Sequence, residues 1–361
     1  MQTKLSIELN GPYGQLMYEK IGEGSFSTVY RTVPGTASMH ALKKPSQYNV
    51  DTYVTYRREL EVLSLFVQPY PHPNIIKFIQ GFYEERPHLF INNTYLAFEC
   101  ANREDLMSYL SESASFLPSR IRYKILLGVA QGLDHLHTNC LLIHRDLKAE
   151  NVVLDFCDHE IVPKIVDFGM SFSIPSTDAV LDNVPCGGSP PYISPETLAE
   201  RSCSVKSDVY AFSILMYVMI HFSYPLNTFF SSEHIDEMKQ GLELVLQGYR
   251  EEFSPCISIE DQRMIHDTWA PNPIDRPTAR QIVEYLQFVL TSMDLSDVAP
   301  VFSFPEKKRL KLWKGPRFGI FDRQENVVLT TADSTKSSEE SLEEAENSYL
   351  GFLTAWLSAP N

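Results

Sequence analysis

The chain has 361 residues, of which 43% are hydrophobic and 21% are charged, an ordinary balance for a globular protein of about two domains. A net charge of −15 would repel a polyphosphate, so we expect no nucleic-acid partner. The longest strongly apolar run covers residues 210–220, too short for a bilayer span of about 20 residues, so we expect no membrane association. Six cysteines without a CxxC pair predict free thiols and a cytoplasmic or nuclear location.

The first predicted unit, residues 15–98, consists of short strands and one helix, and we expect residues 1–14 to be an extension. Segments rich in β-branched and aromatic residues predict strands at 15–21, 28–33, 40–44, 75–84 and 94–99. Between them, Leu60, Leu63 and Phe66 follow a helical spacing and predict a helix over residues 53–66.

The second predicted unit, residues 104–292, is mainly helical. Apolar residues recur every four positions from Ile121 to Leu133 and predict an amphipathic helix over residues 118–138. Residues 210–221 are apolar nearly all round and predict a buried helix, and residues 278–293 predict another amphipathic helix. The tail, 293–361, has a basic stretch at 305–317 and a Ser/Glu-rich stretch at 337–347, so we expect it to be partly disordered. The pattern indicates an α+β body with a small β part and a larger α part.

A glycine-rich turn connects the first two predicted strands. Glycines let backbone N–H groups approach phosphate oxygens, although such a turn taken alone is more often an ordinary hairpin. The segment comprises Ile21, Gly22, Glu23, Gly24, Ser25, Phe26 and Ser27. Lys43 lies on the next strand but one, where its ammonium group could reach the phosphates. Glu59 follows sixteen residues later on the predicted helix and could fix the position of Lys43.

Several charged motifs follow the long predicted helix in a fixed order. His144-Arg145-Asp146 begins the first of them, and Asp167-Phe168-Gly169 begins sixteen residues after Asn151. Three later features are Ser194-Pro195-Glu196, Asp208 and Arg276. Together with the glycine-rich turn and Lys43, their order and context resemble the eukaryotic protein kinases over residues 15–292. The resemblance is to the serine/threonine type, with a faint similarity to the tyrosine-kinase-like group.

This resemblance implies a bilobal protein kinase fold: an antiparallel β N-lobe with one helix (15–98), a hinge (99–103) and a mainly helical C-lobe (104–292). It implies an enzyme that uses ATP and Mg²⁺ to phosphorylate Ser or Thr hydroxyls of protein substrates. In this reading Asp146 is the base, and Asn151 and Asp167 hold Mg²⁺. Lys43 would hold the α- and β-phosphates while Glu59 holds Lys43, and Lys148 would neutralise the γ-phosphate.

The resemblance also implies a nucleotide pocket between the lobes. The glycine-rich turn would cover the phosphates, and the walls and rim of the pocket would comprise Val29, Ala41, Val153, the hinge residues Glu99 and Ala101, and the ribose-binding Asp105. Leu63, His144 and Phe168 match an apolar column that links the lobes, and Glu196 and Arg276 match a structural ion pair. The third glycine of the usual loop is replaced here by Ser27.

Two alternatives are a pseudokinase-like scaffold and a kinase that uses tyrosine as an acceptor. A pseudokinase-like scaffold would bind partners without turnover, but Lys43, Asp146, Asn151 and Asp167 are all present and favour an active enzyme. Tyrosine as an acceptor is disfavoured because Lys148, and Ser189 in the later segment, match the serine/threonine class.

Activation by an upstream kinase is a further possibility. The segment from Asp167 to Glu196 contains hydroxyls at Ser171, Ser173, Ser176 and Thr177. Arg145 and Arg58 could together bind a phosphate there and fix the helix that carries Glu59. However, residues 167–196 contain no Lys or Arg to supply a third contact. The alternative that Arg58 is merely solvated and the segment unregulated stays open.

Overall fold

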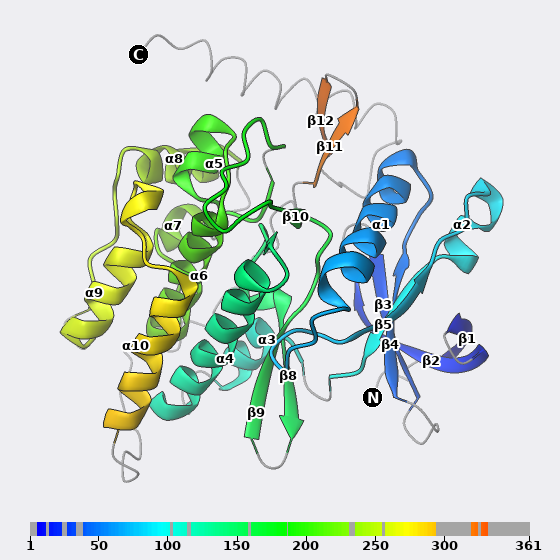
Figure 1. Ribbon diagram of the computed structural model, residues 1–361, viewed down its shortest axis with the longest axis horizontal. Coiled ribbons are helices and arrows are strands. Elements are labelled where there is room, and N and C mark those ends of the chain that lie inside the picture. The colour runs from blue at the N-terminus through cyan, green and yellow to red at the C-terminus, as the bar shows by residue number, and fades with distance from the viewer. Residues whose placement is uncertain are drawn as a thin grey trace.

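The computed structural model describes residues 6–11, 14–23, 27–33, 39–101, 104–113, 117–157, 160–185, 187–230, 235–254, 257–293, 319–323 and 326–330. Figure 1 shows a small lobe built on a sheet, in blue and cyan, beside a larger helical lobe in green and yellow. This is the bilobal α+β arrangement that the sequence predicts.

The N-lobe sheet has the strand order β1-β2-β3-β4-β6-β5, with every neighbouring pair antiparallel. Its strands are β1 (Ser6–Gly11), β2 (Gly14–Glu23), β3 (Ser27–Thr32), β4 (His40–Pro45), β5 (Phe78–Phe82) and β6 (Tyr95–Glu99). The register places Val29 opposite Lys43 and Ala41 opposite Phe98. Strand β1 lies in the stretch expected to be an extension, although the alternation of Ser6-Ile7-Glu8-Leu9 is a strand pattern.

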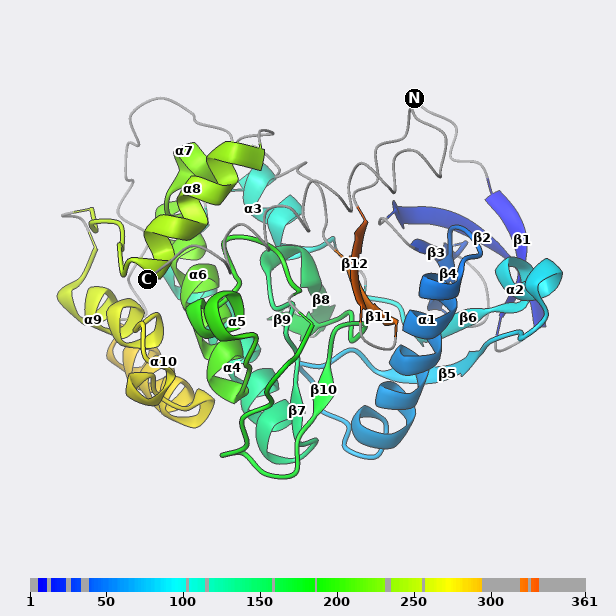
Figure 2. The same ribbon diagram turned by 90° about the horizontal axis from the view of Figure 1, so that it is seen from above.

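Helix α1 (Val50–Val62) lies between the sheet and the C-lobe strands β7 (Leu142–Ile143) and β10 (Phe172–Ser173), as Figure 2 shows. The side chain of Asn49 caps it by accepting a 2.7 Å hydrogen bond from the N–H of Thr52. The helix continues as a π-helical turn, η1 (Leu63–Val67), that supplies buried apolar residues to the junction of the lobes. A second short helix, α2 (Pro87–Asn93), joins β5 to β6 and was not predicted.

The C-lobe is built around helix α6 (Val205–His221), which is buried along nearly its whole length, as its apolar sequence predicts. Long helix α4 (Ser119–Thr138) packs against α10 (Ala279–Ser292) and against α6. The other helices are α3 (Leu106–Ser113), α5 (Pro195–Glu200), α7 (Asn227–Phe230), α8 (Ile235–Leu246), α9 (Ile259–Thr268) and the 3₁₀ turns η2 (Ala149–Asn151) and η3 (Pro273–Asp275). One apolar core extends from this lobe to α1 and the sheet.

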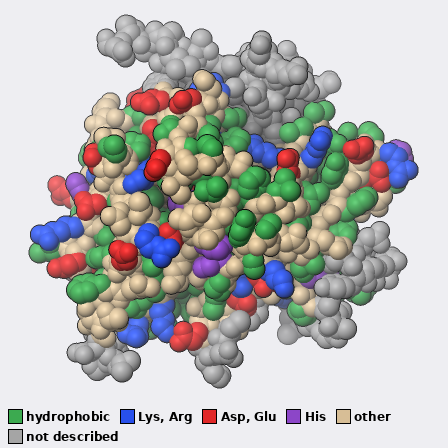
Figure 3. Space-filling view, viewed as in Figure 1, with side chains coloured by type: hydrophobic (Ala, Val, Ile, Leu, Met, Phe, Trp, Pro, Cys, Tyr) green, Lys and Arg blue, Asp and Glu red, His purple; other side chains and the backbone are tan. Residues whose placement is uncertain are grey.

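Two small β-ribbons line the cleft side of the C-lobe. Strand β8 (Val152–Cys157) pairs with β9 (Glu160–Ile165), and β7 pairs with β10. In the tail, β11 (Gly319–Arg323) pairs with β12 (Asn326–Thr330), whereas the segments 305–317 and 337–347 lie outside the described residues. Among the helices of the described residues, none combines the length and the hydropathy that a bilayer span requires. On the described part of the face in Figure 3, acidic and basic side chains are interspersed.

Candidate active site

Three charged side chains from both lobes meet at the cleft. Lys43 Nζ, on β4, donates to both carboxylate oxygens of Glu59 on α1 at 2.8 Å. The same nitrogen donates to Oδ1 of Asp167 at 2.9 Å, across the boundary between the lobes. The sixteen-residue spacing thus brings Lys43 to Glu59 as the sequence predicts, with Glu59 fully buried.

The charges of this triad stabilise one another. Burial would lower the pKa of Lys43, but the carboxylates of Asp167 and Glu59 outweigh it and raise that pKa above its usual value. Burial would raise the pKa of Asp167, yet the ammonium of Lys43 holds it well below its usual range. Burial raises the pKa of Glu59, against the opposing effect of Lys43. A protonated lysine beside an ionised Asp167 is therefore the resting state of the site.

The second cluster lies on the loop between β7 and η2. The amide nitrogen of Asn151 donates to the backbone oxygen of Asp146 at 2.7 Å and to its Oδ2 at 2.9 Å. Lys148 Nζ lies 2.9 Å from Oδ2 of Asp146. The hydroxyl of Ser189 accepts a 2.6 Å bond from Lys148 and donates to Oδ1 of Asp146 at 3.0 Å. This network fixes the orientation of the Asp146 carboxylate.

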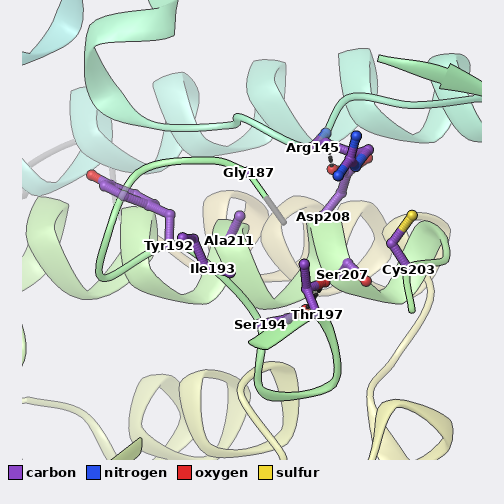
Figure 4. Close-up of a pocket in the computed structure, with 10 residues that line it drawn as sticks. All are labelled: Arg145, Gly187, Tyr192, Ile193, Ser194, Thr197, Cys203, Ser207, Asp208 and Ala211. Carbon is purple, nitrogen blue, oxygen red and sulfur yellow. Dashed lines mark hydrogen bonds between the residues drawn. The ribbon is translucent and has the colours of Figure 1, made fainter. Parts of the chain in front are cut away.

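Buried Asp208, in the first turn of α6, accepts hydrogen bonds from backbone N–H groups of this loop. Its Oδ1 accepts the N–H of Arg145 at 2.8 Å, and its Oδ2 accepts the N–H of His144 at 2.8 Å and Nε2 of His137 at 2.9 Å. Figure 4 shows Asp208 directly beneath Arg145. Arg145 has a φ of +69°, a left-handed conformation that a non-glycine residue adopts only when its surroundings enforce it. The sequence indicated the position of Asp208 but not this function.

A small cavity of about 20 Å³, room for roughly one water molecule, lies beside that contact. Figure 4 shows it between the segment 187–197 and helix α6, with Cys203 at its edge. It is a packing gap under the segment and is too small for a nucleotide.

The apolar column expected between the lobes is formed by packed residues. The rings of His144 and Phe168 meet edge to face with centroids 5.4 Å apart, and Nε2 of His144 bonds the backbone oxygen of Val166 at 3.0 Å. Leu63 and Phe168 both belong to the core cluster that joins the lobes. Through Phe168, the position of Asp167 is therefore coupled to the core.

The residues expected to hold a divalent cation offer oxygen atoms of the right kind. The side chain of Asp167 is 43% exposed, and the amide nitrogen of Asn151 is used by Asp146, so its Oδ1 is the atom left to face a cation. Within the described ranges, no three His, Cys, Asp or Glu side chains form a metal-binding group. Two oxygen donors suit Mg²⁺, which keeps waters and takes substrate phosphate as a ligand. The site therefore fits a cation that arrives with its nucleotide.

The residues expected to contact the nucleotide lie around the same cleft. Val29 on β3, Ala41 on β4 and Val153 on β8 are half-buried. Gly22 and Glu23 end β2, Ser27 begins β3, and a bulge falls at Ile21, whose side chain is exposed. Gly24, Ser25 and Phe26 lie outside the described residues, so the turn itself is not described.

The residues expected at the hinge have partners of their own. The carboxylate of Glu99, at the end of β6, accepts from Lys164 Nζ at 2.8 Å and from the N–H of Lys77 at 2.9 Å. Ala101 follows at the last described position before a gap. Asp105, expected at the ribose, caps α3 by accepting the N–H of Ser108 at 2.9 Å and its hydroxyl at 2.8 Å. Its capping role is one that the sequence reading missed.

The basic residues expected to bind a phosphate have other partners in this structure. Arg58 is not a solvated helix residue: Nη2 donates to the backbone oxygen of Ser171 at 3.0 Å. Arg145 Nη1 donates to the backbone oxygen of Met170 at 3.3 Å. Both guanidinium groups stand over the ring of Phe172, a residue that the sequence reading did not single out. The buried hydroxyl of Ser171 donates to the backbone oxygen of His144.

The expected ion pair between Glu196 and Arg276 is present. Arg276 Nη1 and Nη2 reach the two carboxylate oxygens of Glu196 at 2.8 and 2.7 Å, and both side chains are buried. Burial opposes ionisation of Glu196, but the bonds and charge of Arg276 lower its pKa.

Comparison with known proteins agrees with this geometry. A probable LRR receptor-like serine/threonine-protein kinase of Arabidopsis thaliana is 33% identical over 55% of this chain and 22% of its own length. The Arabidopsis cysteine-rich receptor-like protein kinase 11 is 30% identical over 88% of this chain and 47% of its own length. Cyclic GMP-binding protein C of Dictyostelium discoideum is 28% identical over 72% of this chain and 9% of its own length. The chain thus spans less than half the length of each of these relatives.

The family model for the protein kinase domain matches residues 16–288, which include every charged side chain of the cleft described above. The chain therefore belongs to the protein kinase domain family and is a distant relative of plant receptor-like serine/threonine kinases.

Proposed function

We propose that the protein is an active serine/threonine kinase that transfers the γ-phosphate of ATP to Ser or Thr hydroxyls of protein substrates. The observation that carries this proposal is that the carboxylates of Glu59 and Asp167, one from each lobe, both lie within 2.9 Å of the ammonium group of Lys43. Phosphoryl transfer depends on placing charge around the phosphates, and this triad places a cation and an exposed carboxylate on opposite sides of the cleft.

In the proposed reaction, Asp146 orients the substrate hydroxyl and accepts its proton. The hydroxyl oxygen forms a bond to the γ-phosphorus, the bond from phosphorus to the β–γ bridging oxygen breaks, and ADP leaves with that electron pair. Lys148, 2.9 Å from Asp146, neutralises charge on the transferred group, and Lys43 holds the other phosphates. Bound Mg²⁺, held by Asn151 and Asp167, would offset the negative charge of the phosphates.

The preference for Ser and Thr is supported by the hydroxyl of Ser189, which bridges Lys148 and Asp146 at 2.6 and 3.0 Å. This bridge holds the loop residues close together beside Asp146. The receptor-like relatives are named as serine/threonine-protein kinases, which supports the same acceptor class.

The test is phosphate incorporation by the purified full chain with radiolabelled Mg²⁺-ATP, into itself and into synthetic peptides that contain only Ser, Thr or Tyr as acceptor. We expect incorporation into Ser or Thr, and a decrease of roughly 100-fold or more in Asp146→Asn because general-base and orienting help is lost. The matched control is Asp236→Asn, the same change at a side chain that is 90% exposed, which should keep full activity.

Two results would contradict the proposal. A wild-type protein that binds ATP but incorporates no more phosphate than Asp146→Asn would instead fit the pseudokinase-like scaffold. Incorporation confined to the Tyr peptide would leave a kinase but overturn the acceptor class.

A further inference from the structure

The side chain of Phe172 lies at a junction of three elements. Arg58 lies on α1, and Arg145 lies on the loop between β7 and η2 that carries Asp146, called the catalytic loop below. Their guanidinium carbons lie 3.8 and 4.4 Å from the centroid of the Phe172 ring. Phe172 itself is on β10, where it pairs with Ile143 of β7. One aromatic ring therefore contacts cations from the helix that carries Glu59 and from the loop that carries Asp146.

The two arginines also bind the segment that follows Asp167. Arg58 donates to the backbone oxygen of Ser171 at 3.0 Å, and Arg145 donates to those of Met170 and Pro185 at 3.3 and 2.5 Å. These donors are directed to neutral carbonyl groups of the segment. The arrangement fastens α1, the catalytic loop and the segment to one another through backbone oxygens of the segment.

Two guanidinium groups this close repel each other, and burial further disfavours the charged form of Arg58. Burial, followed by the charge of Arg145, lowers the pKa of Arg58 to about 10. The negative face of an aromatic ring attracts both cations and is most effective where water is excluded. Phe172 is half-buried against an apolar cluster that includes Ile143, Ile174 and Val184, so the ring is held in place.

We propose that Phe172 is a positioning residue whose ring joins Arg58 to Arg145 and so keeps Glu59 and Asp146 in their working positions without a phosphate on the segment. This proposal rests on the proposed kinase function. It is an alternative to the expectation that the two arginines bind a phosphate on the segment. It also explains how a segment without any Lys or Arg between residues 167 and 196 can be ordered beside the catalytic loop.

The first test compares three variants of the full chain in a steady-state peptide phosphorylation assay. Phe172→Leu keeps an apolar side chain but removes the ring, and kcat should fall about tenfold because the competent orientation of α1 becomes less populated. Phe172→Tyr restores the ring and should recover most of kcat. The matched control is Phe288→Leu, the same change at a ring on α10 that is 68% exposed, which should leave activity unchanged.

The second test asks whether the ring acts through Arg58. Arg58→Met removes the cation, and in the wild-type background it should lower kcat by a similar factor to Phe172→Leu. In the Phe172→Leu background it should add less than twofold, because the contact is already lost. Effects that multiply, or equal losses in Phe172→Leu and Phe172→Tyr, would overturn the proposal and leave a packing role only.

The third test is direct: wild-type protein is dephosphorylated with a broad-specificity phosphatase, and mass spectrometry verifies that residues 167–196 carry no phosphate. We expect at least half of the initial rate to remain. Activity that requires phosphate on Ser173, Ser176 or Thr177 would overturn the role of Phe172 while leaving the protein a kinase. Inactivity of both the phosphorylated and the dephosphorylated protein would instead remove the proposed function itself.

Discussion

A single hydroxyl, that of Ser189, illustrates how much of the proposed chemistry depends on individual atoms. It accepts from Lys148 at 2.6 Å and donates to Asp146 at 3.0 Å, and the residue is buried. Without it, the Asp146 carboxylate would keep its contacts with Asn151 and Lys148 at Oδ2 but would lose the hydroxyl donor at Oδ1. Hydrogen bonds to charged groups are about twice as strong as those between neutral groups, so the bridge is a strong constraint on the loop.

Ser189→Ala should therefore lower kcat about tenfold with a smaller change in the KM for a peptide substrate, because the base loses its orientation rather than the peptide its contacts. Ser189→Thr keeps the hydroxyl and should retain most activity. The measurement is steady-state peptide phosphorylation at saturating ATP. Ser194→Ala serves as control, since it removes a buried hydroxyl of the same segment that contacts Thr197 instead. Equal losses in Ser189→Ala and Ser194→Ala would refute a specific role for the bridge.

At the residue scale, the sequence predicts contacts correctly where two opposite charges pair. Lys43 and Glu59 are sixteen residues apart on a strand and a helix, and the structure joins them at 2.8 Å. Phe172 was missed because a lone aromatic residue carries no signal until Arg58 and Arg145, far apart in sequence, are placed over it. The capping role of Asp105 could have been found, since an aspartate just before a helix is a common cap.

At the scale of elements, the predicted strands and helices largely coincide with the observed ones, and the differences have physical causes. Residues 75–84 were predicted as one strand, but β5 begins only at Phe78. Ile75 and Ile76 have strand-like side chains, yet their backbone contacts Ile165 of the C-lobe instead of the sheet. Helix α2 has only seven residues, too few to show a periodic pattern.

The pair of Glu196 and Arg276 fastens α5 to the segment before α10. Both side chains are buried, and Arg276 also donates to the backbone oxygens of Ala270 and Lys206 at 2.8 and 2.9 Å. Arg276→Met should lower the free energy of unfolding by about 3–5 kcal/mol, because it leaves a buried carboxylate without its partner. Urea denaturation of the purified protein measures this change.

The matched control is Arg280→Met on α10, whose pair with Asp134 is just as short at 2.7 Å but whose side chain is 63% exposed. An exposed pair contributes less than about 1 kcal/mol. A similar loss of stability in the two variants would show that burial is not what makes the Glu196 pair important.

The loop after η1 contains a pH-sensitive contact between the lobes. The His72 ring stacks on that of His135 of α4 with centroids 4.7 Å apart, and Nδ1 of His72 accepts the N–H of Asn74 at 3.2 Å. Burial, followed by the charge of His135, lowers the pKa of His72 to about 4. The folded state thus binds this proton less readily than the unfolded chain, whose histidine pKa is about 6.5, so stability is lost as pH falls from about 6.5 to about 4.

Integration over that window gives an upper bound of about 2 kcal/mol lost between pH 7.5 and pH 5, which solvent screening of the half-buried ring reduces to roughly 1 kcal/mol. The prediction is that His72→Gln, which cannot be protonated, loses less stability than wild type by about this amount over the same interval. Urea denaturation at the two pH values measures the difference. A parallel decline of both proteins would mean that the stacked pair does not contribute to the acid sensitivity.

At the scale of the whole molecule, the Lys43–Asp167 contact joins the two lobes through opposite charges on either side of the cleft. A phosphate between them would attract Lys43, and a cation would attract Asp167, so nucleotide and metal together can replace the direct contact. The two lobes should therefore be stabilised jointly by Mg²⁺-ATP, and this coupling could not be read from any single motif.

Mg²⁺-ATP at about 100 times its Kd should stabilise the folded protein by about 2.7 kcal/mol, a rise in Tm of roughly 5 °C or more for a domain of this size. ATP with a chelator should give a clearly smaller rise, because the carboxylate of Asp167 then faces the phosphates without a cation between them. In Asp167→Asn the two conditions should converge, since the charge that makes Mg²⁺ necessary has been removed. Differential scanning fluorimetry measures all four values, with Asp236→Asn as the variant of equal charge change. An identical rise with and without Mg²⁺ in wild type would contradict the assignment of Asp167 to the cation, whereas no rise at all would mean that the folded protein does not bind the nucleotide.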